Sequence, residues 1–316
     1  MISDSTMKSL LIFMVMIAAT LGACSGQDKM AKGNALMAEQ KFAEAEVVFQ
    51  EIVKNDPDDA AALNALGNAR FSQAKWDLCM ADLGKAIELA EKAGLPKDTI
   101  GSYYFDRGLA NYIQGQYGSA RTDFQAAVDR AYDLGESYAY LGVTMGNIGD
   151  DIKAIDYLNK AVKADPTSHF AWSNRGYYNS KVGDNKTAIF DFSKAIELLP
   201  NDKVSYLNRG YTYIGMGDYE SALKDIDKSL ALDSTYLGAI AYKGIALTNT
   251  GQSLEGIRWL DKAIEMQPEN PAFYYYRGVA LINAGIIDRG CSDLATAAAG
   301  GHVDGEGMRE QYCKGK

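Results

Sequence analysis

The hydrophobic positions of the chain recur at i, i+3, i+4 and i+7 over almost its whole length, which is the spacing of amphipathic helices. The apolar stretches come in pairs, and a short turn such as Gly149-Asp150 or Gly217-Asp218 separates the two members of a pair. Proline, which cannot continue a helix, closes four of the pairs, for example at Pro200. The pattern therefore predicts a series of helical hairpins.

A glycine stands at the same place in eight successive pairs, and consecutive glycines lie 34 residues apart except for one interval of 41. These glycines are Gly33, Gly67, Gly108, Gly142, Gly176, Gly210, Gly244 and Gly278. The long interval contains seven extra residues, 94–100, between the second and third units. Because one hairpin cannot bury its apolar face alone, we expect the units to stack into an all-α solenoid, with the glycines where helices touch.

The 34-residue period resembles the tetratricopeptide repeat (TPR), and it reads clearly in "AWSNRGYYNSKVGDNKTAIFDFSKAIELLP" (171–200) and "YLNRGYTYIGMGDYESALKDIDKSLALD" (206–233). The resemblance implies a right-handed α-solenoid over 24–304, whose concave wall consists of the first helices, followed by a short capping helix within 305–316. The expected units are approximately 26–59, 60–93, 101–134, 135–168, 169–202, 203–236, 237–270 and 271–304.

In the TPR family, first-helix residues at set distances from the glycine line a binding groove. The resemblance places the following residues in that groove: Phe105, Leu109, Tyr112, Tyr177, Leu207, Tyr211, Tyr275 and Ile282. Such a groove is rich in tyrosine and aliphatic side chains, and tyrosine is enriched at interfaces. The alternative for each residue is packing between neighbouring units. The Lys/Asn set with which some family members clamp a peptide carboxylate is not reproduced.

Four units share an arginine directly before the glycine and an aspartate 16 residues after that arginine. The pairs are Arg107/Asp123, Arg175/Asp191, Arg209/Asp225 and Arg277/Asp293. We expect each arginine to pair with an aspartate, within one unit or across to a neighbour. The alternative is an arginine ladder that binds an acidic ligand. The second unit departs from the pattern, with Leu66 and Asp82 at these places.

The first 23 residues have the character of a secretory signal. Lys8 precedes an apolar stretch of 11 residues, Leu10–Thr20, which is too short for a membrane span of about 20 residues. The next four residues, Leu21-Gly22-Ala23-Cys24, resemble the bacterial lipobox. That resemblance implies removal of residues 1–23, lipidation of Cys24 and, since Ser25 follows, a preference for the outer membrane, with its face left open. The alternative is an ordinary signal peptide that ends beside a cysteine.

The three further cysteines are expected to have structural roles. Cys79 occupies a small-residue position of the second unit, where a buried thiol is expected. Cys291 lies in the last second helix and Cys313 in the expected cap. These two form a disulfide if the compartment is oxidising and the geometry permits, and spacing alone decides neither condition.

The sequence contains no pattern typical of a catalytic site, a metal centre or a cofactor. Only two histidines occur, His169 and His302, and no metal-protease, nucleophile-elbow or phosphate-loop motif is present. A net charge of −9 argues against nucleic acid as a partner. The sequence thus favours a non-catalytic, lipid-anchored scaffold of the bacterial cell envelope that binds a partner protein or peptide of unknown identity. Two alternatives are glycan or small-ligand capture by the tyrosine-rich groove, and an enzyme.

Overall fold

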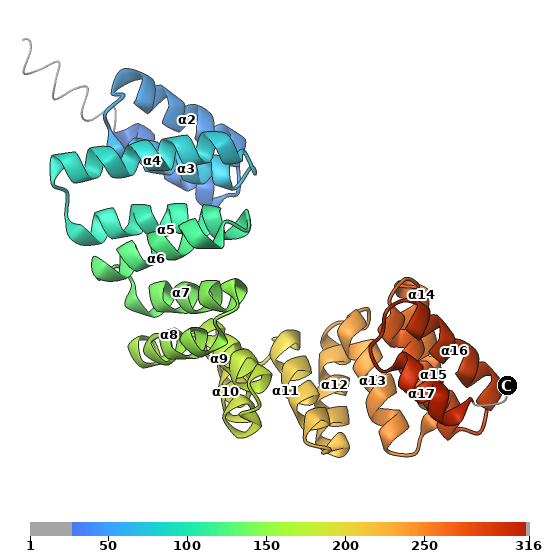
Figure 1. Cartoon of the computed structure of the whole chain (residues 1–316). Helices are drawn as coiled ribbons and strands as arrows, with labels where there is room; N and C mark the ends of the chain where they lie inside the picture. Colours follow the sequence, from blue (N-terminus) through green and yellow to red (C-terminus); the bar gives the residue numbers. More distant parts are fainter. Residues whose placement is uncertain (1–26, 314–316) are drawn as a thin grey trace, which may run out of the picture. The chain divides into compact units, whose positions relative to one another are not determined.

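The computed structural model describes residues 27–313, and every regular element in that range is an α-helix, which confirms the all-α class (Figure 1). The first helix covers 27–38. It is followed by α2 (Phe42–Asn55), α3 (Ala60–Phe71), α4 (Trp76–Ala93), α5 (Lys97–Ile113), α6 (Tyr117–Asp129), α7 (Leu134–Ile148), α8 (Asp151–Ala164), α9 (His169–Lys181), α10 (Asn185–Leu198), α11 (Lys203–Gly215), α12 (Tyr219–Leu232), α13 (Leu237–Asn249), α14 (Ser253–Met266), α15 (Pro271–Asn283), α16 (Ile287–Ala299) and α17 (Gly305–Tyr312).

The chain divides into two compact units, the first ending at Asp150 and the second beginning at Asp151. In the first unit, α3 packs on α4 and α5 on α6. In the second unit, α9 packs on α10, α11 on α12, α13 on α14 and α15 on α16 (Figure 1). Successive hairpins also touch through their first helices, since α11 contacts both α9 and α13, and α13 contacts α15. Within each unit this is the stacking of helical hairpins that the sequence period predicts.

The seven extra residues 94–100 lengthen helices instead of forming a loop of their own. α4 continues for 18 residues and ends at Gly94, which has a left-handed φ of 64°. α5 then begins at Lys97 and runs for 17 residues. The link is therefore short, and the third hairpin starts earlier than the expected position 101.

The repeated glycines make room for a large side chain on the second helix of the same hairpin. A Cβ on Gly176 would lie 2.9 Å from Cε1 of Phe192, and a Cβ on Gly108 would lie 2.8 Å from Cε1 of Phe124. Both phenylalanines are fully buried. The glycine thus lets the two helices approach until the ring fills the space between them.

The turn between the two helices of a hairpin requires a left-handed residue seven positions after the repeated glycine. Six hairpins use glycine there, for example Gly183 with φ 88° and Gly217 with φ 77°. The first two hairpins use Gln40 (φ 59°) and Ala74 (φ 56°). A side chain in this conformation costs about 1–2 kcal/mol, so these two turns are strained.

Replacing Ala74 by glycine is expected to stabilise the protein by about 1 kcal/mol, because glycine removes the Cβ from a left-handed position. The measurement is the free energy of unfolding from urea titrations. Gly183→Ala is the matched control and is expected to destabilise by a similar amount. A loss of stability in Ala74→Gly would contradict the strain.

The last hairpin carries a covalently attached cap. Cys291 on α16 and Cys313, directly after α17, form a disulfide with their Cα atoms 5.8 Å apart. A Cβ on Gly305 would lie 2.8 Å from the backbone nitrogen of Ala298, so α17 begins in close contact with the end of α16. Cys79 is fully buried beside Leu83 and Ala110, and burial first, with the charges of Asp82 and Asp106, raises its pKa to about 11.

Candidate functional site

The four arginine–aspartate pairs form within single hairpins. In each, the arginine Nε donates to one carboxylate oxygen and Nη2 to the other; for Arg175 and Asp191 these distances are 2.9 and 2.6 Å. Arg107–Asp123, Arg209–Asp225 and Arg277–Asp293 repeat the arrangement. Such bidentate pairs are strong and fix the geometry of both groups. Pairing within one unit is confirmed.

The third nitrogen of three of these arginines reaches the preceding hairpin. Arg175 Nη1 donates to Asn159 Oδ1 at 2.9 Å. Arg209 Nη1 donates to Ser193 Oγ at 2.8 Å, and Arg277 Nη1 donates to Asp261 Oδ1 at 2.7 Å. In the seventh hairpin Lys243 takes the arginine position and binds Asp227 of the preceding hairpin at 2.7 Å. The arginines therefore join neighbouring hairpins, and their role as a ladder for an acidic ligand is wrong.

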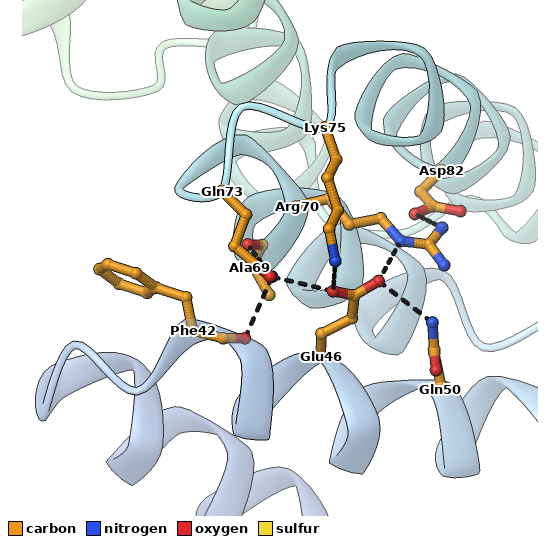
Figure 2. Close-up of polar contacts among 8 residues, drawn as sticks. All are labelled: Phe42, Glu46, Gln50, Ala69, Arg70, Gln73, Lys75 and Asp82. Atoms are coloured by element: carbon orange, nitrogen blue, oxygen red, sulfur yellow. Dashed lines mark hydrogen bonds and ion pairs between the residues drawn. The ribbon is translucent and has the colours of Figure 1, made fainter.

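In the second hairpin, an arginine at a different position of the repeat also joins the hairpin to the preceding one. Arg70, three residues after Gly67, pairs with Asp82 and also with Glu46 of the first hairpin, at 3.1 Å (Figure 2). Lys75 and Gln73 also donate to Glu46, at 2.6 and 2.9 Å. Burial opposes the charge of Glu46, but these donors outweigh it and lower the pKa of the carboxyl. This bridge was missed in the sequence because its arginine is displaced from the repeat position.

Four tyrosines stand on successive first helices of the second unit, two of them exposed and two partly buried against the core, and we name this set the tyrosine strip. They are Tyr177 on α9, Tyr211 on α11, Tyr242 on α13 and Tyr276 on α15. Tyr177 and Tyr211 are 47% and 50% exposed. The rings of Tyr211 and Tyr242 lie 5.0 Å apart with 40° between their planes.

The strip extends beyond the residues that the family pattern indicated. Tyr177 and Tyr211 follow the repeated glycine directly, whereas Tyr242 and Tyr276 both stand two residues before it. Burial first, and then the hydroxyls of Tyr211, Tyr276, Tyr236 and Tyr177, raise the pKa of Tyr242 to about 12. Tyr242 and Tyr276 could have been found in the sequence from their shared place two residues before the glycine.

Two predicted groove residues are core residues instead. Phe105 is buried among the rings of Phe124, Tyr132 and Tyr140. Leu207 is buried because the next first helix presents Gly238, where a Cβ would lie 2.9 Å from Leu207 Cδ2. Phe105 is therefore held by neighbouring aromatic rings, and Leu207 turns inward over a glycine of the next first helix.

Four of the remaining predicted groove residues are half-buried, and three of these four have contacts within the chain. Tyr112 accepts a hydrogen bond from Asn147 at 3.1 Å, and Tyr275 is stacked on His302 with ring centroids 4.1 Å apart. Ile282 packs toward Gly290 of α16. Leu109 is half-buried. Of the predicted set, only Tyr177 and Tyr211 present exposed rings that the structure extends into the strip.

The first unit has a pocket of about 420 Å³ that sequence reasoning did not identify. Its lining includes Met30, Met37, Asn64, Asn68 and Tyr103. Asn64 and Asn68 both donate to Asp106 Oδ2 at 2.8 Å, which fixes their side chains, and Asn64 Oδ1 is buried without a hydrogen bond within the described chain. Burial, opposed by Asn68 and Asn64, raises the pKa of Asp106. The pocket therefore combines an apolar wall with fixed amides.

Residues 27–313 show neither a metal-binding cluster nor a helix that could span a membrane. No group of three or more histidine, cysteine, aspartate or glutamate side chains is placed to hold a metal ion there. Over the same residues, each helix falls short of the length or the hydrophobicity that crossing a bilayer demands.

The stacked hairpins define a helical-repeat protein, and matches to models of known protein families identify its family. Models described as tetratricopeptide repeat match residues 30–95, 105–169 and 192–224, together just over half of the chain. The chain belongs to the tetratricopeptide repeat family.

Solved structures share the fold at low identity. YrrB, described as a TPR protein with an unusual peptide-binding site, matches with a TM-score of 0.50 and 22% identity over 62% of this chain and 97% of YrrB. A TPR protein from Parabacteroides merdae matches with a TM-score of 0.58 and 15% identity over 81% and 99%. A chain of the APC/C hetero-tetramer Cut9–Hcn1 matches with a TM-score of 0.63 and 16% identity, over 82% of this chain and 48% of that chain. These likenesses support the fold alone.

Proposed function

We propose that the protein is a non-catalytic scaffold that holds a protein or peptide partner along the tyrosine strip, tied to the bacterial envelope by a lipid on Cys24. The observation that carries this proposal is the strip itself, because it presents the exposed rings of Tyr177 and Tyr211 on neighbouring first helices, α9 and α11, whose hairpins the bridge from Arg209 to Ser193 joins. Tyrosine combines apolar area with a hydrogen-bonding group and is common at binding hot spots. Membership of the TPR family supports the same class of function.

The partner can be sought by capture from envelope membranes with the full-length chain in detergent. We expect the double variant Tyr177→Ala/Tyr211→Ala to lose the partner, because both exposed rings are removed. Phe190→Ala is the matched control, since Phe190 is a 53% exposed aromatic on the second helix α10. Equal capture in all three proteins would show that the partner binds away from the strip, and failure of the unaltered protein to capture any partner would contradict the scaffold. Binding to an immobilised polysaccharide that is lost only in the double variant would favour the glycan alternative.

The anchor is a separate part of the proposal, and its residue lies outside the described range. Cys24→Ser is expected to move the protein from the membrane fraction to the soluble fraction, because no lipid can be attached to serine. The measurement is fractionation of cells with immunoblotting, and protease treatment of intact cells reports the face. Ser25→Asp is the companion variant, expected to stay membrane-bound and to move toward the inner membrane. Unchanged membrane binding of Cys24→Ser would refute the anchor.

A further inference from the structure

The pocket of the first unit contains two polar groups that the protein itself leaves without a partner. The Oδ1 atom of Asn64 is buried and makes no hydrogen bond within residues 27–313. Tyr103, only 6% exposed, also lines the pocket, and its hydroxyl makes no hydrogen bond in that range. Because buried polar groups in proteins are almost always hydrogen-bonded, these two groups point to a ligand that completes them.

The carboxyl group of Asp106 determines which way the pocket amides face. A carboxylate only accepts hydrogen bonds, so Asn64 and Asn68 both turn their Nδ2 atoms toward Asp106 Oδ2, at 2.8 Å each. The oxygen of an amide points away from its nitrogen, which leaves the Asn64 oxygen as an acceptor directed elsewhere. The negative charge behind the two amides polarises them and strengthens their oxygens as acceptors. The missing partner of Asn64 is therefore a hydrogen-bond donor.

The pocket also lies beside negative charge that the protein does not neutralise. Asp106 makes no ion pair within the part of the chain that the structure describes, and the adjacent Arg107 is held by Asp123. Among the described residues that line the pocket there is no lysine, arginine or histidine. Burial first, and then the charges of Asp59 and Asp106, raise the pKa of Tyr103. A positively charged donor is thus the best electrostatic match for the pocket.

The rest of the pocket wall is apolar and adaptable. Met30 and Met37 come from the first helix, and Ala61 and Ala65 come from α3. Methionine side chains are flexible, and their sulfur atoms make favourable contacts with aromatic rings. The volume of about 420 Å³ lies in the range of pockets that hold small organic molecules. The pocket therefore suits a ligand with a small apolar body, such as one aromatic ring.

We propose that this pocket binds a small organic ammonium ion with an apolar, ring-sized body. The ammonium group donates to Asn64 Oδ1 and to the hydroxyl of Tyr103, which can accept as well as donate. The body packs against Met30 and Met37, and Asp106 balances the positive charge through the amides that it holds. The site lies in the first unit and the tyrosine strip in the second, so the proposal goes beyond the scaffold function.

The test measures binding of 2-phenylethylammonium to the full-length chain in a non-ionic detergent by isothermal titration calorimetry. Two probes with the same ring are the controls, uncharged 2-phenylethanol and the anion 3-phenylpropionate. Titration into detergent alone corrects for partition into micelles. We expect the ammonium ion to bind at least tenfold more tightly than the alcohol and the anion not to bind, because only the cation matches the charge of the pocket.

Two variants test the parts of the pocket separately. Asp106→Asn keeps the shape and an oxygen for the amides but removes the charge. It is expected to weaken binding of the ammonium ion at least tenfold and to leave binding of the alcohol unchanged. Tyr103→Phe removes only the hydroxyl and is expected to weaken binding of the ammonium ion about fivefold. Asp156→Asn, at an exposed ion pair on α8, is the matched control and is expected to have no effect.

The proposal is overturned if the ammonium ion does not bind, if the alcohol binds as tightly, or if Tyr103→Phe and a correctly folded Asp106→Asn both bind the ammonium ion like the unaltered protein. Circular dichroism reports folding, and if Asp106→Asn does not fold, the result for Tyr103→Phe alone decides. Capture of a partner through the tyrosine strip is measured separately, so failure of either proposal leaves the other standing.

Discussion

Asp191→Ala is expected to destabilise the second unit by about 3–5 kcal/mol, because it leaves the Arg175 guanidinium buried without its carboxylate. The side chain of Asp191 is fully buried, and it receives hydrogen bonds from Arg175 and Asn179. Burial, opposed by Arg175 and Asn179, raises its pKa, so the ion pair itself contributes little net stability. The cost arises from breaking the pair, which strands one charge.

A double variant separates these two contributions. Arg175→Met/Asp191→Leu removes both charges, and we expect it to be less destabilising than Asp191→Ala, because no charge remains unpaired. Asp156→Ala on α8 is the matched control for an exposed pair, with a cost below about 1 kcal/mol. The measurement is urea unfolding followed by circular dichroism. A single variant no less stable than the double would refute the buried-charge explanation.

Phe192→Ala is expected to cost about 3–5 kcal/mol, because it empties the space that Gly176 opens between α9 and α10. Phe190, two residues earlier on the same helix, is 53% exposed, so Phe190→Ala is a control with the same change of side chain. It packs at 6.0 Å against Trp172, and we expect a cost of about 1 kcal/mol or less. Equal losses in the two variants would mean that the glycine–phenylalanine contact does not define the hairpin core.

The fold was predictable because the same contact forms between the same positions of successive repeats. A glycine on the first helix and a large residue 16 positions later, such as Gly176 and Phe192, lie against each other in seven hairpins of the described residues, so the period in the sequence is the period in space. The arginine–aspartate pairing followed for the same reason. Arg70 escaped prediction because it reaches Asp82 from a different turn of the helix, which a fixed spacing cannot reveal.

The binding surface was less predictable, because a first-helix position does not decide by itself whether a side chain faces outward. Leu207 and Tyr275 stand at the same place before their glycines, yet Leu207 turns inward over Gly238 and Tyr275 meets His302. The size of a neighbour, 30 or so residues away, determines the outcome. The left-handed Gln40 and Ala74 were hidden in the same way, since the turn conformation is imposed by packing and not by those residues.

His302 stacks on Tyr275, which precedes Tyr276 of the tyrosine strip. The loop before α17 therefore contacts the ring next to Tyr276. The disulfide between Cys291 and Cys313 links the C-terminal end of α17 to α16. Reduction of that bond would leave α17 attached by packing alone, of which the close approach of Gly305 to Ala298 is one contact.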